Sequence, residues 1–280
     1  LRKPSSRWTR NRSCTNIHGG PLNGGRPLET AAFEVGNYRY IRGPFQYSGG
    51  VAAEQGYAIE RVRFSRPLPM VEGFRAIDAH LTARSRPFTA FCACELRSPA
   101  PFTETEFIAF NRVYVGTLER WGIYRDEDNP VARSNVFPEI EPPPEPSFEA
   151  FCYTVPAPDG AQDSAVKSFV ISGSGETPEG QASYEEGAIR RGETSPEAMR
   201  EKACFVLGVM ESRMAALGVG WAEASATQLY TVYDIHPFLA DEIVSRGAAH
   251  SGLTWYYARP PVKGLDFEMD VRGIPVERLL

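Results

Sequence analysis

The order of strands and helices predicted for the first half of this 280-residue chain recurs in the second half, and such a repeat constrains the fold more than any single motif does. The strongly β-forming run at residues 88–96 is matched by a run at 227–235. Phe148-Glu149-Ala150, near the end of the first half, is matched by Phe267-Glu268-Met269 near the end of the second. We therefore predict an α+β protein of two tandem units, each a mixed sheet with two helices on one face.

A polar, turn-forming segment separates the two halves and defines the predicted domains. We expect a first unit at residues 37–154, a linker at 155–165 and a second unit at 166–280. Residues 1–36 form a leader that is rich in arginine and lysine and has no acid among its first 26 residues. We expect this leader to be an extended tail or a segment that covers a sheet edge.

Composition excludes several classes of protein. An apolar fraction of 42% and a charged fraction of 23% are typical of a globular chain rather than a disordered one. No apolar run approaches the ~20 residues that span a bilayer, so we expect no membrane insertion. The net charge of the whole chain is −5, and because the leader is basic, the remaining body is more acidic than this value, which argues against a nucleic-acid partner. The leader lacks the apolar core of a secretory signal, and we expect a cytoplasmic protein.

One arginine and one glutamate in neighbouring predicted strands are candidates for a small-molecule site. Arg133 follows a proline-marked turn at the start of a strand, and its planar guanidinium matches the geometry of a carboxylate. Glu149 lies sixteen positions later on the next strand, where it could handle a proton or a water. On these residues alone, an ordinary strand pair whose charged groups lie in solvent is the favoured interpretation.

Three segments in a fixed order resemble the YjgF/RidA family of enamine and imine deaminases. Ala132-Arg133-Ser134, followed by the strand of Phe148-Glu149-Ala150, is similar to the family's C-terminal signature. Tyr47-Ser48-Gly49-Gly50 resembles its Ser-Gly-Gln, and residues 107–114 resemble its second helix. The resemblance implies hydrolysis of a small enamine or imine carboxylic acid, similar to 2-aminoacrylate or aminomuconate, to a keto acid and ammonia. It also implies a homo-oligomer, with a trimer favoured, that needs no cofactor.

The resemblance assigns roles to individual residues. Arg133 would bind the substrate carboxylate, and Glu149 would position or activate the attacking water. The other residues that match positions near the family's site are expected to contact or orient the substrate. They are Ser48, Gly49, Asn111, Tyr114 and Ser134.

Two alternatives remain open from the sequence. The second half lacks a counterpart of Arg133, but Arg259 precedes Glu268 by nine residues, and the two-unit layout also resembles chorismatases. Glu268 would then donate a proton to a vinyl ether, with Tyr233 and Tyr256 completing the pocket. A module that binds a small acid without turnover is the other alternative. We expect no metal site, because the four histidines are scattered along the chain.

Overall fold

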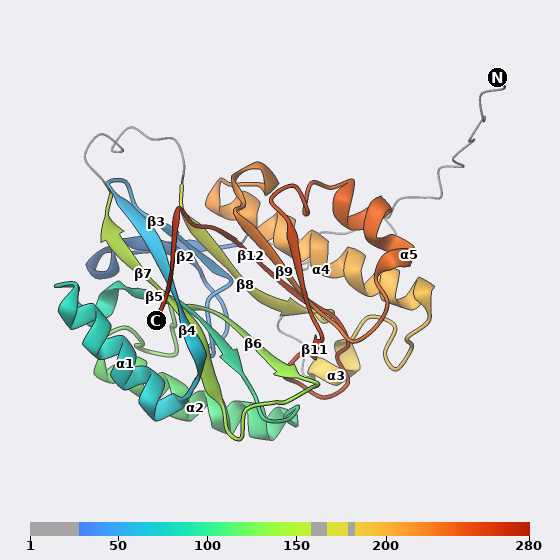
Figure 1. The fold of residues 1–280 in the computed structure, drawn as a ribbon, viewed down its shortest axis with the longest axis horizontal. Coiled ribbons are helices and arrows are strands. Elements are labelled where there is room, and N and C mark those ends of the chain that lie inside the picture. Colours follow the sequence, from blue (N-terminus) through green and yellow to red (C-terminus); the bar gives the residue numbers. More distant parts are fainter. Residues whose placement is uncertain (1–27, 158–166, 179–182) are drawn as a thin grey trace.

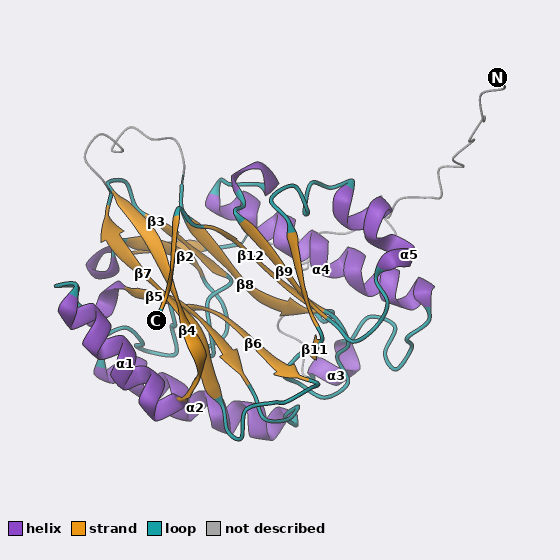
Figure 2. Ribbon diagram, viewed as in Figure 1, coloured by secondary structure: helices purple, strands orange, loops and turns teal. Residues whose placement is uncertain are grey.

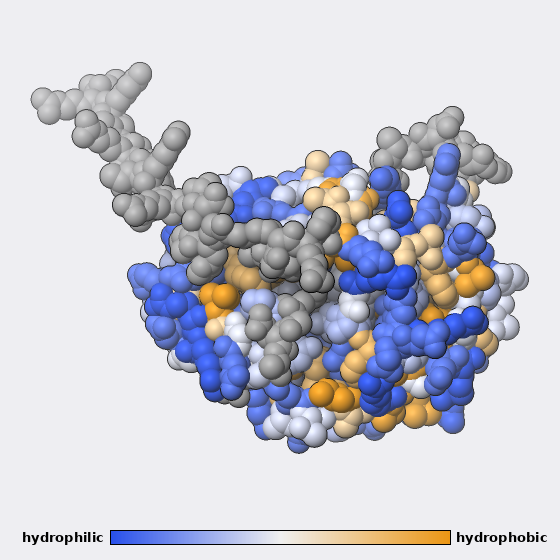
Figure 3. Space-filling view, turned by 180° about the vertical axis from the view of Figure 1, so that it is seen from behind, coloured by the Kyte–Doolittle hydropathy of each residue, from blue (hydrophilic) through white to orange (hydrophobic). Residues whose placement is uncertain are grey.

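The computed structural model describes residues 28–157, 167–178 and 183–280, and these form two β-sheets that pack against each other with helices on the outer faces (Figure 1). Strands account for the centre of the molecule and helices for its two outer layers (Figure 2). On the face opposite to that of Figure 1, hydrophobic residues are scattered among hydrophilic ones (Figure 3). No helix among the described residues is long and apolar enough to cross a membrane.

The larger sheet combines strands from both ends of the chain. In order across the sheet, its seven strands are β1 (Thr30–Phe33), β2 (Tyr38–Ile41), β3 (Gly50–Ala53), β8 (Phe169–Gly175), β12 (Glu268–Gly273), β9 (Ala226–Tyr230) and β10 (Leu253–Tyr256). Its neighbours pair antiparallel except β9 and β10, which are parallel. Strands β3 and β8 therefore join the early hairpin to the second half of the chain.

The smaller sheet is built mainly from the first half of the chain. In order, its six strands are β11 (Ala258–Arg259), β6 (Ala132–Pro138), β5 (Phe91–Arg97), β7 (Ser147–Pro156), β4 (Tyr57–Pro69) and β13 (Val276–Leu279). Strands β5 and β6 are parallel, as are β4 and β13. Both edges of this sheet are thus supplied by the second half of the chain.

Helices cover the outer face of each sheet (Figure 1). On the smaller sheet lie α1 (Met70–Ala83) and α2 (Glu104–Arg120). On the larger sheet lie α4 (Pro196–Leu217), α5 (His236–Phe238) and a π-helical turn at Leu239–Val244. The remaining short helices are α3 (Tyr184–Gly187) and 3-10 turns at Glu34–Gly36, Phe88–Ala90 and Trp221–Glu223.

Local sequence explains where the long helices begin. Thr103 and Glu106 form a capping box at the start of α2, in which each side chain binds the backbone N–H of the other residue. Ser195 Oγ accepts a hydrogen bond from the Ala198 N–H, and Pro196 occupies the first turn of α4. Each of these helices therefore begins at the residue that follows its side-chain cap.

Each sheet has its own apolar core against its helices, and a third cluster joins the sheets. The interface between the sheets also holds buried ion pairs. Arg61 binds the Glu95 carboxylate at 2.7 and 3.0 Å, and Gln228 of the other sheet donates to Glu95 at 3.4 Å and to Asp270 at 3.1 Å. Because both sheets contribute to this polar layer, it fixes how one sheet lies on the other.

The α+β class with two mixed sheets is confirmed, while three strand assignments differ from the prediction. The hairpin within residues 37–53 was expected in the first unit, but it pairs with β8 of the larger sheet. Residues 253–259, predicted as one strand, divide into β10 and β11, which belong to different sheets. Strand β13 was not predicted. These features depend on partners far away in sequence, which a local pattern does not encode. The domain boundaries at 37–154 and 166–280 stay a prediction.

Candidate active site

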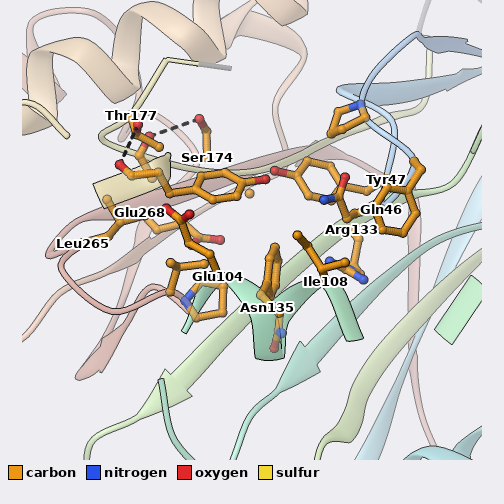
Figure 4. A pocket seen from close by; sticks show the side chains of 18 of the residues that line it. Gln46, Tyr47, Glu104, Ile108, Arg133, Asn135, Ser174, Thr177, Leu265 and Glu268 are labelled. Carbon is orange, nitrogen blue, oxygen red and sulfur yellow. Dashed lines mark hydrogen bonds between the residues drawn. The ribbon is translucent and has the colours of Figure 1, made fainter. Parts of the chain in front are cut away.

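A cavity of about 340 Å³ lies where the two sheets meet near the start of α2 (Figure 4). It is lined by the loop at residues 44–47, one face of β6, the end of β8 and the segment at 261–268. The first half of the chain therefore supplies one wall and the second half the other. Its charged and amide lining residues are Gln46, Glu104, Arg133, Asn135 and Glu268.

Arg133 is held rigidly with one of its nitrogens unpaired. Its side chain is 3% exposed, and Nη1 donates to Asn111 Oδ1 at 2.5 Å. The guanidinium carbon lies 5.0 Å from the centroid of the Tyr114 ring and 5.3 Å from that of Tyr47. Nη2 is buried and has no hydrogen-bond partner among the described residues. A buried, unpaired cationic donor in a cavity wall is suited to binding a carboxylate.

The elements around Arg133 explain its placement. Asn111 is itself fixed, because its Nδ2 donates to the Phe107 carbonyl one turn earlier in α2, at 2.6 Å. The backbone N–H of Arg133 donates to Ser172 Oγ of β8 at 3.0 Å, which ties β6 to the other sheet. The predicted residues Asn111 and Tyr114 thus contact Arg133 from behind the cavity wall rather than lining the cavity.

Glu268 faces the same cavity from the first position of β12 (Figure 4). It is 4% exposed. Its carboxylate lies over Gly173 of β8, where an added Cβ would come within 2.1 Å of Glu268 Oε1. Only glycine at this position leaves room for the carboxyl group, so the sequence of β8 determines where Glu268 can lie.

The environment of Glu268 favours its protonated form. Burial raises its pKa well above that of an ordinary glutamate. The charges of Asp270 and Glu176 raise the pKa further, while Arg133 and Arg213 oppose the shift without cancelling it. Glu268 therefore carries a proton at pH values where an exposed glutamate is ionised, as a general acid requires.

A buried ion cluster fixes the chain segment that leads into Glu268. Lys202 Nζ of α4 lies 2.5 Å from Asp266 Oδ2 and 3.2 Å from Glu176 Oε1. The Glu176 carboxylate also accepts the backbone N–H groups of Asp266 and Phe267, at 2.7 and 3.1 Å. Helix α4 and the residue that follows β8 thereby hold the backbone immediately before Glu268.

Three of the charged and amide residues that line the cavity were not predicted as site residues. Gln46 and Asn135 are buried amides, and Glu104 accepts a hydrogen bond from Ser183 Oγ at 2.7 Å. Asn135 stands two residues after Arg133 in β6, so strand alternation would have placed it on the same face. Gln46 lies in a loop, and no sequence pattern points to it.

Two of the predicted residues with charged side chains lie outside the cavity. Glu149, on β7, accepts a hydrogen bond from Arg63 at 3.2 Å and does not line the cavity. Arg259 of β11 binds Glu139 at 2.8 Å and the Tyr233 hydroxyl at 3.3 Å. The structure thus brings Arg133 together with Glu268 and not with Glu149 or Arg259.

The three remaining predicted residues lie near the junction of the sheets, behind the cavity lining. The Ser48 carbonyl accepts the Ser172 hydroxyl at 2.6 Å, and Gly49 lies next to the side chains of Ile41 and Arg213. Ser134 points to the opposite side of β6 from Arg133 and hydrogen-bonds Asp270. Within the described part of the chain, no group of His, Cys, Asp or Glu side chains is arranged to hold a metal ion.

Comparisons with known proteins identify the family of the chain. A model of the family described as 2-aminomuconate deaminase CnbZ matches residues 30–278. The 2-amino-5-chloromuconate deaminase of Comamonas testosteroni is 52% identical over 252 residues, which cover 90% of this chain and 99% of that protein. This match confirms the deaminase resemblance predicted from the motifs.

Two solved structures show weaker likeness. A chorismatase crystal structure aligns with a TM-score of 0.44 and 10% identity over 89% of this chain and 80% of that one. E. coli TdcF with bound serine aligns with a TM-score of 0.28 and 14% identity over 38% of this chain and 80% of that one. The assignment is decided by the family match and the relative at 52% identity: the chain belongs to the CnbZ family of 2-aminomuconate deaminases.

Proposed function

We propose that this protein hydrolyses a 2-aminomuconate, an enamine with two carboxylates, to the corresponding keto acid and ammonia. The observation that carries the proposal is one cavity with an unpaired donor of Arg133 in one wall and, in the other, the buried carboxyl group of Glu268, whose pKa burial raises. The family membership and the name of the relative support the same reaction.

Arg133 binds a substrate carboxylate through the free Nη2. Because Nη1 is already engaged by Asn111, the guanidinium plane is fixed before substrate arrives, and little side-chain entropy is lost on binding. The surrounding aromatic rings exclude water from this contact and strengthen it. Asn111 and Tyr114 act as positioning residues for Arg133 in this account.

Glu268 serves as acid and then as base. It first gives its proton to the carbon next to the amino-bearing carbon, and the enamine becomes an iminium ion. The resulting carboxylate then takes a proton from the water that attacks the iminium carbon. The C–N bond of the carbinolamine breaks, and ammonia leaves with the proton returned by Glu268. The hydroxyl proton then passes to the Glu268 carboxylate as the C=O bond forms, which restores the protonated acid. One water is consumed and no electrons are exchanged.

This assignment distributes the site over both halves of the chain. Arg133 comes from the first unit, at residues 37–154, and Glu268 from the second, at 166–280. The alternative in which Glu149 activates water requires that residue to leave Arg63 and reach the cavity. We therefore assign Glu149 and Arg259 no role in the reaction.

We further propose that the protein acts in the cytoplasm, without a cofactor, as a homotrimer. Proton transfer and addition of water complete the reaction, so neither a redox group nor a metal is needed for its balance. The trimer rests on the resemblance to the YjgF/RidA family. Light scattering coupled to size-exclusion chromatography tests it, and a monomer would contradict it.

An ammonia-release assay on freshly generated enamine acids tests the proposed function. We expect release from 2-aminomuconate by the wild type and loss of about 10²-fold or more in kcat/KM for Arg133→Ala. Arg259→Ala is the matched control, since it removes an arginine outside the cavity and should change kcat/KM less than about threefold. Failure of the folded wild type to release ammonia would contradict the proposal.

A further inference from the structure

Two amide side chains in the cavity have polar atoms that no described residue satisfies. Gln46 is 6% exposed, and its Oε1 has no hydrogen-bond partner. Asn135 is 4% exposed; its Oδ1 accepts from Ser98 Oγ at 2.9 Å, while its Nδ2 has no partner. Unpaired buried polar atoms destabilise a protein, and native structures contain few of them. Their presence in the lining of one cavity indicates a ligand with complementary groups.

Asn135 is placed to act with Arg133. The two residues are separated by one position in β6, so their side chains lie on the same face of the strand, with Cα atoms about 6.6 Å apart. Both have an unpaired N–H donor, on Arg133 Nη2 and Asn135 Nδ2. The hydrogen bond from Ser98 fixes the Asn135 amide with its nitrogen available. Two such donors on one strand face match the oxygens of a substrate acid.

Gln46 offers the complementary polarity. Asn129 Nδ2 donates to the carbonyls of Phe45 and Gln46 at 3.1 and 3.0 Å, so the loop backbone is fixed while Oε1 of the Gln46 side chain has no partner. In the close view, Gln46 lies at the same end of the pocket as Arg133, and Glu268 lies toward the other end (Figure 4). An acceptor beside the carboxylate-binding arginine is where the amino group of a 2-amino acid would lie.

We infer that Gln46 and Asn135 divide the recognition of the substrate: Gln46 Oε1 accepts a hydrogen bond from the amino group, and Asn135 Nδ2 donates one to a carboxylate. This inference rests on the proposed function, because it takes a 2-aminomuconate as the ligand. It makes both amides specificity-determining residues, with separate effects on ligands that carry or lack the amino group.

Two ligands with the same carbon skeleton separate these effects. We would measure kcat/KM for 2-aminomuconate and the inhibition constant of muconate, which keeps both carboxylates but lacks the amino group. Gln46→Leu should lower kcat/KM about tenfold and leave the muconate constant within about twofold of wild type. Asn135→Leu should lower kcat/KM for 2-aminomuconate about tenfold and raise the inhibition constant of muconate about tenfold.

Equal effects of Gln46→Leu on the two ligands, or no effect of either substitution, would overturn the inference. If Gln46→Leu does not fold, Gln46→Met replaces it, because methionine keeps the length of the side chain without an acceptor. A wild type that binds muconate but does not turn over 2-aminomuconate counts against the proposed function instead. In that case, calorimetry of 2-aminoadipate and adipate binding to the wild type and to Gln46→Leu tests Gln46 without turnover. Equal losses of affinity for the two ligands would again overturn the role of Gln46.

Discussion

Substitution of Gly173 by alanine tests whether the position of the Glu268 carboxyl group controls the reaction. The new Cβ would lie 2.1 Å from Glu268 Oε1, 3.2 Å from its Cδ and 3.2 Å from the Cα of Ser134. Carbon and oxygen atoms in ordinary contact are about 3.5 Å apart, so the carboxyl group must move by more than about 1 Å. The backbone at Ser134 must give by only a few tenths of an ångström.

The expected result is a large loss of activity with a small loss of stability. A displacement of about 1 Å in a catalytic group costs roughly 10²-fold in rate, and we expect kcat to fall by that factor. The tip of a flexible side chain absorbs most of the clash, so we expect the free energy of unfolding to fall by about 1–2 kcal/mol. Steady-state ammonia release and urea denaturation measure the two quantities.

Gly116→Ala is the matched control. Gly116 lies within α2, where an added Cβ would meet only Arg120 Nη1 at 3.9 Å. Alanine there should leave kcat unchanged and stabilise the protein by about 0.5–1 kcal/mol. A folded Gly173→Ala variant with kcat within about threefold of wild type would refute the argument that Glu268 must occupy its observed position.

Three further predictions concern stability. The pKa of Glu268 is raised in the folded state, so its contribution to the free energy of unfolding is complete at pH values below the ordinary glutamate pKa. This contribution is lost as the pH rises toward the folded pKa, at up to about 1.4 kcal/mol per pH unit. Urea unfolding should therefore show Glu268→Gln gaining stability relative to wild type between about pH 5 and pH 8, and a constant difference would contradict this. Lys202→Met leaves the buried acids Glu176 and Asp266 without their cation, and it should lower the free energy of unfolding by about 3–5 kcal/mol in the same assay. A decrease below about 1 kcal/mol would show that the cluster contributes little to stability. Ser195→Ala removes the cap of α4 and should lower the free energy of unfolding by about 1 kcal/mol, and no measurable loss would mean that Pro196 alone sets the helix start.

Local sequence signals predicted the elements that local interactions form. The starts of α2 and α4 follow from local sequence, because the caps Thr103 and Ser195 lie within one turn of the groups they bind. Arg133 was predicted as a ligand-binding residue because Ala132-Arg133-Ser134 resembles the signature of the YjgF/RidA family, and not from its place at a strand start alone. Glu268 was singled out by its place in the repeat, although its predicted substrate was a vinyl ether.

The pairing of Arg133 with Glu268 could not be predicted from local patterns. It depends on β6 lying beside β8, and on β8 pairing with β12, which join residues separated by many positions in sequence. The space for the Glu268 carboxyl group depends on Gly173. In the sequence, this glycine looks like an ordinary residue of a strand, and nothing indicates that a side chain will lie against it. The expectation that Glu149 works with Arg133 assumed a site within one unit, whereas the cavity lies between two sheets.

The most direct test of the composite site compares two isosteric substitutions in one assay. We would measure kcat/KM for deamination of 2-aminomuconate by Glu268→Gln and Glu149→Gln beside the wild type. Glutamine keeps the shape of each side chain but cannot donate the acid proton, so Glu268→Gln should lose at least about 10²-fold, while Glu149→Gln should stay within about threefold of wild type. A large loss for Glu149→Gln together with near-normal activity for Glu268→Gln would contradict the account.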